Sequence, residues 1–175
     1  MAVQAVAFVA RGKTGKTTLI ERLLPELARR GYRVGAIKHD AHRFEIDTPG
    51  KDSHRLTSAG AETMLISSAE KLALVKRHPR PPSAEELLRT YFADMDLVLV
   101  EGFRMSGLPK IEIHRKERGD PLICRGERHD PALIAVASDG PIDVDVPVLD
   151  LNAPDRVADF IEARLLTGGA DPEGP

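Results

Sequence analysis

The chain has 175 residues, with 25 lysine and arginine and 27 aspartate and glutamate side chains, so its formal net charge is −2. This balance, with few aromatic residues for base stacking, gives no global attraction to nucleic acid or anionic membranes, and we expect neither as a partner. A single cysteine excludes an intrachain disulfide, and no apolar run approaches the roughly 20 residues of a membrane span, so we expect a cytoplasmic protein.

A glycine-rich segment, residues 10–18 (ARGKTGKTT), follows an apolar run at residues 3–9 and precedes a helical pattern over residues 16–30. Strand, loop and helix in this order are what a P-loop requires. The first glycine of the G-x-x-x-x-G-K-[ST] motif is replaced by Ala10, the smallest substitute. The context therefore predicts a phosphate-binding loop although one motif position differs.

Each residue type in this segment has its own physical role. Backbone N–H groups must point into one concavity to hold phosphate oxygens, and Gly12 and Gly15 relieve the crowding there. Lys16 is expected to contact the β- and γ-phosphates, and the Thr17 hydroxyl to bind Mg²⁺ at the positive end of the helix. The predicted nucleotide-binding residues of this segment are Arg11, Gly12, Lys13, Thr14, Gly15, Lys16, Thr17 and Thr18.

The middle of the chain begins with a second predicted strand at residues 32–37, parallel to the first. A polar loop at 41–51 and a short helix at 53–59 follow. Strands at 63–67 and 72–75 would form a β-hairpin at the sheet edge.

A second motif follows a helix that begins at Ser83 with Glu86 three residues later, a capping box. Residues 96–102 (DLVLVEG) place four apolar residues before a carboxylate, as in a Walker B strand that is buried on both faces. Glu101 at its tip would hold Mg²⁺ directly or through water. Taken alone, a strand-end glutamate is also compatible with a solvated side chain; with a P-loop elsewhere in the chain the metal role is favoured.

The last elements are weaker signals. Residues 110–115 (KIEIHR) alternate like a half-exposed strand, residues 122–124 resemble a strand with a structural Cys124, and residues 133–137 resemble a buried strand. A short strand at 146–149 precedes a closing helix at 153–166, capped by Asp155 or Asn152. We predict an α/β P-loop NTPase fold, a three-layer sandwich with a mostly parallel central sheet and additional edge strands. It would be a single nucleotide-binding domain over residues 1–166, with a disordered tail over 167–175.

Five segments together resemble the MobB family, over roughly residues 3–166. They are A-x-x-x-x-G-K-T-T at 10–18, I-K-H-D at 37–40, F-E-I-D-x-P-G-K-D-S at 44–53, V-E-G-F-R at 100–104 and P-K-I-E at 109–112. The resemblance implies a homodimeric GTP-binding adapter of molybdopterin guanine dinucleotide biosynthesis, which hydrolyses GTP slowly and assists the guanylyltransferase MobA. It also implies that Asp40 and Glu101 hold the metal, with Lys16 and Glu101 supporting hydrolysis. Whether molybdopterin itself contacts the chain stays open.

The base site has no N-K-x-D guanine motif. Asp139 ends a predicted buried strand, where such a motif often lies, and its carboxylate could accept from guanine N1–H and the 2-amino group. Asp139 followed by Gly140 is equally typical of a turn. Both interpretations stay open at this point.

Two other functions use the same loop. A P-loop phosphotransferase acting on a small metabolite would need an acceptor pocket with a base near the γ-phosphate. A GTP-dependent metallochaperone would need tight binding of a transition metal. The GTP-binding adapter is the main hypothesis.

Overall fold

The computed structural model describes residues 3–12, 14–40, 44–126 and 129–167. The chain divides into two compact units, one of residues 1–39 with 83–175 and one of residues 40–82. Residues 168–175, most of the predicted tail, and Lys13 of the glycine-rich segment lie outside the described residues. The single domain over residues 1–166 stays a prediction.

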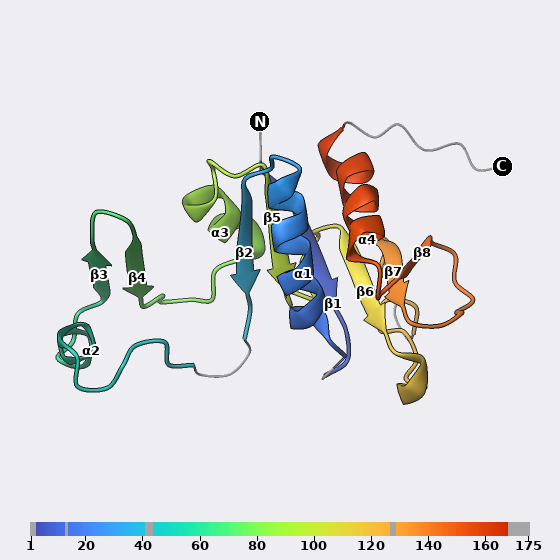
Figure 1. The fold of residues 1–175 in the computed structure, drawn as a ribbon. Coiled ribbons are helices and arrows are strands. Elements are labelled where there is room, and N and C mark those ends of the chain that lie inside the picture. The colour runs from blue at the N-terminus through green and yellow to red at the C-terminus, as the bar shows by residue number, and fades with distance from the viewer. Residues whose placement is uncertain (1–2, 13, 41–43, 127–128, 168–175) are drawn as a thin grey trace. The chain divides into compact units, whose positions relative to one another are not determined.

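Six strands form the central sheet of the first unit, in the order β2-β5-β1-β6-β7-β8 (Figure 1). They are β1 (Gln4–Val9), β2 (Val34–Lys38), β5 (Leu97–Glu101), β6 (Lys110–His114), β7 (Leu133–Ser138) and β8 (Val148–Asp150). Every neighbouring pair is parallel. The carboxyl ends of all six strands therefore lie at one edge of the sheet.

Helices cover both faces of this sheet. The helices α1 (Lys16–Arg29) and α4 (Pro154–Ile161) pack on the face that contains Val6 and Phe8 of β1. The helix α3 (Ala84–Tyr91) packs on the opposite face, through Leu88. Strands buried on both faces are near-continuous apolar runs, as in β5. The predicted three-layer α/β fold is confirmed.

Local sequence signals set several helix ends. The helix α1 begins after Gly15, whose backbone is left-handed, and buries Leu19, Ile20, Leu23 and Leu27. The capping box of α3 is present, with Ser83 and Glu86 each accepting from the other's backbone N–H. None of the helices in the described part of the chain has the length and apolar character that a bilayer crossing requires.

The sequence pattern misplaced two later features. The segment at Cys124 is a bend and not a strand. The residue that caps α4 is Ala153, without a side-chain hydrogen bond, instead of Asp155 or Asn152. Alanine has no side-chain oxygen to accept the free N–H groups of the first turn, and Pro154 occupies the first helical position, where its fixed φ suits the helix. The helical chain continues after α4 as a π-helical turn, Glu162–Leu166.

The second unit contains the helix α2 (Asp52–Ser58) and the antiparallel strands β3 (Thr63–Ser67) and β4 (Leu72–Lys76). The predicted hairpin is present, but it forms a separate two-stranded sheet and not an edge of the central one. One face of the hairpin carries three exposed aliphatic side chains: Leu65, Leu72 and Leu74.

The strand β6 is internal, between β1 and β7, and not the half-exposed strand that its alternation predicted. Lys110 and Glu112 are 1% and 2% exposed. The ammonium of Lys110 donates to the carbonyl oxygen of Ser106 at 2.5 Å and pairs with Asp130 at 3.0 Å. Alternation marks the two faces of a strand, but it does not tell whether a loop covers the polar one.

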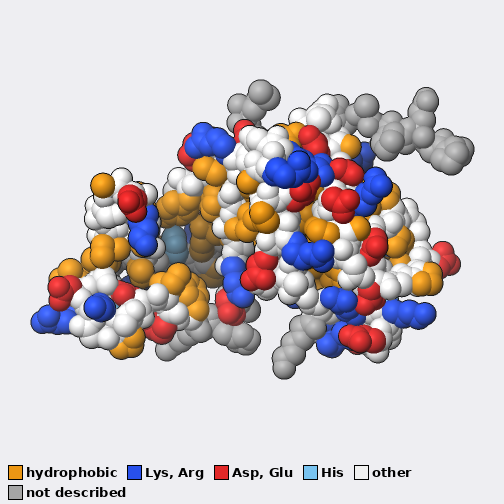
Figure 2. Space-filling model, in the orientation of Figure 1, with side chains coloured by type: hydrophobic (Ala, Val, Ile, Leu, Met, Phe, Trp, Pro, Cys, Tyr) orange, Lys and Arg blue, Asp and Glu red, His pale blue; other side chains and the backbone are white. Residues whose placement is uncertain are grey.

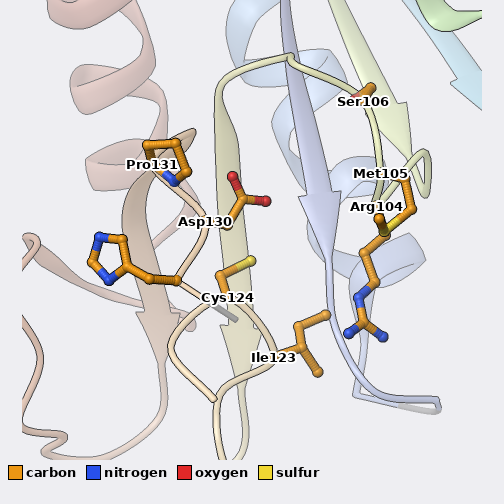
Figure 3. Close-up of a pocket in the computed structure, with 8 residues that line it drawn as sticks. Arg104, Met105, Ser106, Ile123, Cys124, Asp130 and Pro131 are labelled. Atoms are coloured by element: carbon orange, nitrogen blue, oxygen red, sulfur yellow. The ribbon is translucent and has the colours of Figure 1, made fainter. Parts of the chain in front are cut away.

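Two segments cover the polar face of β6, and a cavity of about 240 Å³ lies between them (Figure 3). One carries Arg104, Met105 and Ser106, and the other carries Ile123, Cys124, His129, Asp130 and Pro131. The carboxylate of Glu112 accepts the N–H groups of Ile123 at 2.6 Å and Cys124 at 2.9 Å. Burial raises the pKa of the Cys124 thiol to about 12, which fits a structural cysteine and not a nucleophile.

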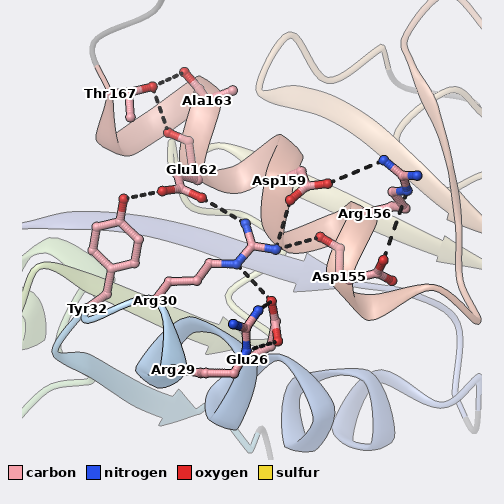
Figure 4. A network of polar contacts seen from close by, with 10 residues as sticks. All are labelled: Glu26, Arg29, Arg30, Tyr32, Asp155, Arg156, Asp159, Glu162, Ala163 and Thr167. Carbon is pink, nitrogen blue, oxygen red and sulfur yellow. Dashed lines mark hydrogen bonds and ion pairs between the residues drawn. The ribbon is translucent and has the colours of Figure 1, made fainter.

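A polar network joins the end of α1 to α4 (Figure 4). The guanidinium of Arg30 contacts carboxylates of Glu26 at 2.9 Å, Asp159 at 2.8 Å and Glu162 at 2.8 Å. The hydroxyl of Tyr32 donates to Glu162 at 2.6 Å. Figure 2 shows basic and acidic side chains next to one another on the face that carries these two helices. Hydrogen bonds from Arg29 and Arg30 lower the pKa of Glu26 from 4.5 to about 2.

We predict that Glu26→Gln lowers the thermal unfolding midpoint at neutral pH, because the amide loses its charge-assisted bonds to Arg29 and Arg30. The pKa of Glu26 is depressed on folding, so its stabilisation is complete above pH 4.5 and is lost as pH falls toward about 2. The difference between parent and variant midpoints, measured by circular dichroism, should shrink across this range.

Glu21→Gln is the matched control, because Glu21 is an exposed carboxylate on the same helix. It should change the midpoint less than Glu26→Gln at neutral pH. A difference between parent and Glu26→Gln that stays constant down to about pH 2 would contradict the assigned role of this carboxylate.

Candidate functional site

The glycine-rich loop, residues 10–17, connects the carboxyl end of β1 to the first turn of α1. Gly15 has φ +92° and ψ +21°, a left-handed conformation that glycine adopts without steric cost. The buried hydroxyl of Thr14 donates to the carbonyl oxygen of Arg11 at 3.1 Å and closes the loop on itself. The strand-loop-helix geometry predicted from the sequence is present.

The side chains of Thr17 and Glu101 meet at this edge of the sheet. The Thr17 hydroxyl donates to Oε2 of Glu101 at 2.8 Å, and Lys38 Nζ lies 4.0 Å from Oε1. The strand register places Lys38, Glu101 and Phe8 beside one another on β2, β5 and β1. The two predicted metal-binding residues of this unit are therefore in contact.

A hydroxyl and a carboxylate are the oxygen ligands that Mg²⁺ takes, usually with waters and the phosphates of a substrate. Among the described residues, no three His, Cys, Asp or Glu side chains converge as a metal-binding group. Thr17 and Glu101 thus fit an ion whose remaining ligands come from a bound phosphate or water. Asp40, the first residue of the second unit, stays a predicted ligand.

Glycine is required directly after Glu101. Gly102 has φ +101°, and a Cβ there would lie 3.0 Å from the carbonyl oxygen of His39. The next residue, Phe103, also has a positive φ, +49°, and its ring packs on that of His39 with centroids 4.1 Å apart. Two successive residues with positive φ therefore change the direction of the chain directly after the carboxylate.

The other predicted loop residues that the structure describes differ in how exposed they are. Lys16 is the first residue of α1 and is half-buried. Three of the others are exposed: Arg11, Gly12 and Thr18. Exposed or half-buried positions at a helix N-terminus are accessible to an anionic ligand.

Asp139 directly follows β7, and its carboxylate has partners within the chain. Its Oδ1 accepts from the backbone N–H of Lys116 at 2.8 Å, and its Oδ2 accepts from Arg115 Nη1 at 3.0 Å. These two bonds, that of Lys116 first, lower the pKa of Asp139. An ionised carboxylate has about four acceptor positions, so both oxygens keep a lone pair for another donor.

Arg115 was not identified from the sequence as a site residue. Besides Asp139, it contacts the glycine-rich loop, where its Nε donates to the carbonyl oxygen of Thr14 at 3.2 Å. A signal was available, because Arg115 follows a strand that is parallel to β1 and therefore ends at the same edge. The alternating pattern of residues 110–115 concealed it.

Comparison with known proteins places the chain in one family. The model of the MobB family, described as molybdopterin guanine dinucleotide synthesis protein B, matches residues 5–139. The molybdopterin-guanine dinucleotide biosynthesis adapter protein of Haemophilus influenzae is 41% identical, over 87% of this chain and 84% of that protein. The protein of the same name from Escherichia coli is 40% identical, over 91% of each chain.

Solved structures agree with the sequence relatives. A crystal structure of Bacillus subtilis MobB superposes with a TM-score of 0.73 at 28% identity, over 93% of this chain and 98% of that one. A crystal structure of molybdopterin-guanine biosynthesis protein B gives a TM-score of 0.65 at 30% identity, over 90% of this chain and 95% of that one. The family model covers the glycine-rich loop, Glu101 and Asp139. By sequence and by fold, the chain belongs to the MobB family.

Proposed function

We propose that this chain is a cytoplasmic GTP-binding adapter of molybdopterin guanine dinucleotide biosynthesis, which hydrolyses GTP slowly and assists a MobA-like guanylyltransferase. Its relatives are named as adapter proteins of this biosynthesis. The observation that carries the nucleotide part is the contact between Thr17 and Glu101 beside the glycine-rich loop. A hydroxyl and a carboxylate at the carboxyl edge of a parallel sheet are what a nucleotide-bound Mg²⁺ requires.

In this proposal each residue has one role. The loop N–H groups and Lys16 bind the phosphates, and Thr17, Glu101 and Asp40 hold Mg²⁺. A bound Mg²⁺ supplies charge neutralisation on the phosphate oxygens during hydrolysis. Asp139 accepts from the guanine edge, a pairing that adenine does not offer.

An adapter acts by binding other proteins. The resemblance to MobB implies a homodimer, and the exposed aliphatic face of the β3–β4 hairpin supports this proposal. Leu65, Leu72 and Leu74 are 51%, 67% and 37% exposed and lie on one side of the two strands. Contiguous exposed apolar side chains of this kind mark protein interfaces.

The first test is a calorimetric titration of GTP, ATP and GDP, with and without Mg²⁺, into the parent and Lys16→Ala. Lys16→Ala removes a charge-assisted contact worth roughly 1.5–3 kcal/mol, so GTP affinity should fall about ten- to a hundredfold. The circular dichroism spectrum should be unchanged, since Lys16 is outside the buried core. A folded Lys16→Ala chain that binds GTP as tightly as the parent does would show that this loop is not the phosphate site.

Glu101→Gln should act differently from Lys16→Ala. The amide keeps the shape of Glu101 but removes one negative charge from the metal position, while the loop contacts to phosphate remain. GTP should still bind, and both its Mg²⁺ dependence and its hydrolysis should weaken. Phosphate release and GTP titration across a Mg²⁺ series measure the two effects; an unchanged Mg²⁺ dependence would remove Glu101 from the metal site.

The double variant Leu65→Asp/Leu74→Asp should convert a dimer to a monomer. It places two carboxylates directly across from each other on the β3–β4 hairpin, and burying unpaired carboxylates in an interface is costly. Sedimentation velocity at micromolar concentration measures the change. Arg89→Asp, on an exposed position of α3, is the control and should leave the dimer intact. A monomeric parent chain at this concentration would contradict the proposed assembly.

A further inference from the structure

Arg115 joins two parts of the candidate site with one guanidinium. Its Nε donates to the carbonyl oxygen of Thr14 in the glycine-rich loop at 3.2 Å, and its Nη1 donates to Asp139 at 3.0 Å. Its Nη2 lies 3.2 Å from the position that a Cβ on Gly15 would occupy, so the group packs over this glycine. The side chain is 30% exposed. The planar guanidinium of Arg115 therefore contacts both the glycine-rich loop and the residue that follows β7.

The bond to Thr14 fixes the direction of a loop N–H group. The peptide between Thr14 and Gly15 is planar and trans, so its N–H points opposite to its carbonyl. Because the carbonyl oxygen is held by Arg115, the N–H of Gly15 points away from Arg115. Gly15 is left-handed and precedes α1, which is the geometry in which successive N–H groups form an anion-binding concavity.

The bond to Asp139 fixes the orientation of a carboxylate. Arg115 holds Oδ2 and the backbone N–H of Lys116 holds Oδ1, so the carboxylate plane is defined from two sides. A carboxylate that recognises guanine must present both oxygens in one plane to the N1–H and 2-amino donors. The free lone pairs of Asp139 are thus presented in a fixed direction.

We propose that Arg115 is a positioning residue that couples recognition of a guanine base at Asp139 to binding of the phosphates in the glycine-rich loop. This inference rests on the proposed GTP binding and assigns its base specificity to the Arg115–Asp139 pair. A base that engages Asp139 orders the guanidinium, and the ordered guanidinium holds the Thr14 peptide in its phosphate-binding direction. By linkage, phosphate in the loop favours the same orientation of Asp139.

Arginine suits this role and lysine does not. The guanidinium is planar and carries donors at fixed angles, so it reaches a carbonyl and a carboxylate at once, whereas an ammonium is a single point charge. Arg118 offers a matched comparison. It lies three residues further along, and its guanidinium pairs with Asp120 at 2.9 Å.

The experiment measures the affinities of three ligands by calorimetry with Mg²⁺: GTP, inosine triphosphate, which lacks the 2-amino group, and inorganic tripolyphosphate, which lacks the nucleoside. The variants are Arg115→Ala, Arg115→Lys, Asp139→Asn, the Arg115→Ala/Asp139→Asn double and the control Arg118→Ala. Lys16→Ala serves as the loss-of-phosphate reference. Circular dichroism confirms that each variant is folded.

Asp139→Asn should weaken GTP about tenfold or more, because it removes a charged acceptor for the base. It should weaken tripolyphosphate by a smaller factor, because it weakens only the ion pair that orders Arg115. Arg115→Ala should weaken the binding of GTP and of tripolyphosphate. It should also reduce the ratio of the affinity for GTP to the affinity for inosine triphosphate. In the double variant, the added loss from Asp139→Asn should be several-fold smaller than in the parent, which is the signature of coupling. Arg115→Lys should keep part of the tripolyphosphate affinity but not the GTP preference. Arg118→Ala should match the parent.

Two results with the variants would overturn the inference, and two results with the parent chain test base recognition and the proposed function. In the first, Asp139→Asn lowers the GTP affinity by the same factor in the parent and in Arg115→Ala, so that the two effects are additive. In the second, Arg115→Ala binds GTP, inosine triphosphate and tripolyphosphate with the same affinities as the control Arg118→Ala. A parent chain that binds tripolyphosphate and GTP with equal affinity would remove base recognition at Asp139 while leaving the phosphate site intact. A parent that binds no GTP would instead refute the proposed function.

Discussion

The parallel direction of all six strands is the constraint on which the candidate site depends. It brings the residues that follow β1, β2, β5, β6 and β7 to one edge of the sheet. Thr17 and Glu101 are 84 positions apart in sequence, yet their side chains are in hydrogen-bond contact. The contact requires the register that pairs Phe8 with Glu101, because a slip of one residue would point Glu101 to the other face of β5.

Buried charge gives the centre of the sheet its specific arrangement. Burying an ion is costly unless hydrogen bonds and an opposite charge compensate it. Lys110 meets this condition with Asp130 and the Ser106 carbonyl, and Glu112 with two backbone N–H groups. Each charge thereby selects one position for a covering segment. Arg115 directly follows this strand, so the compensated charges also help to fix the position of its backbone.

Features that depend on local sequence were predictable, and features that depend on distant partners were not. The glycine-rich loop, the buried run ending at Glu101 and the capping box at Ser83 are each defined by a few consecutive residues. The burial of Lys110 depends on segments that alternation does not reveal. Arg115 was missed for the same reason, because its two partners lie 101 and 24 positions away in the sequence.

The helix α1 carries the stabilising Arg30 network at one end and the proposed phosphate site at the other. It has 14 residues, so its ends are separated by about 20 Å at 1.5 Å per residue. Arg29 and Arg30 lie at its carboxyl end, where cations interact favourably with the helix dipole, and Arg30 also pairs with Asp159 of α4. Lys16 lies at the opposite, positive end, where the same dipole favours an anion. A change in the Arg30 network should therefore alter how firmly the helix is anchored without removing a phosphate contact, so stability and affinity report on opposite ends of one element.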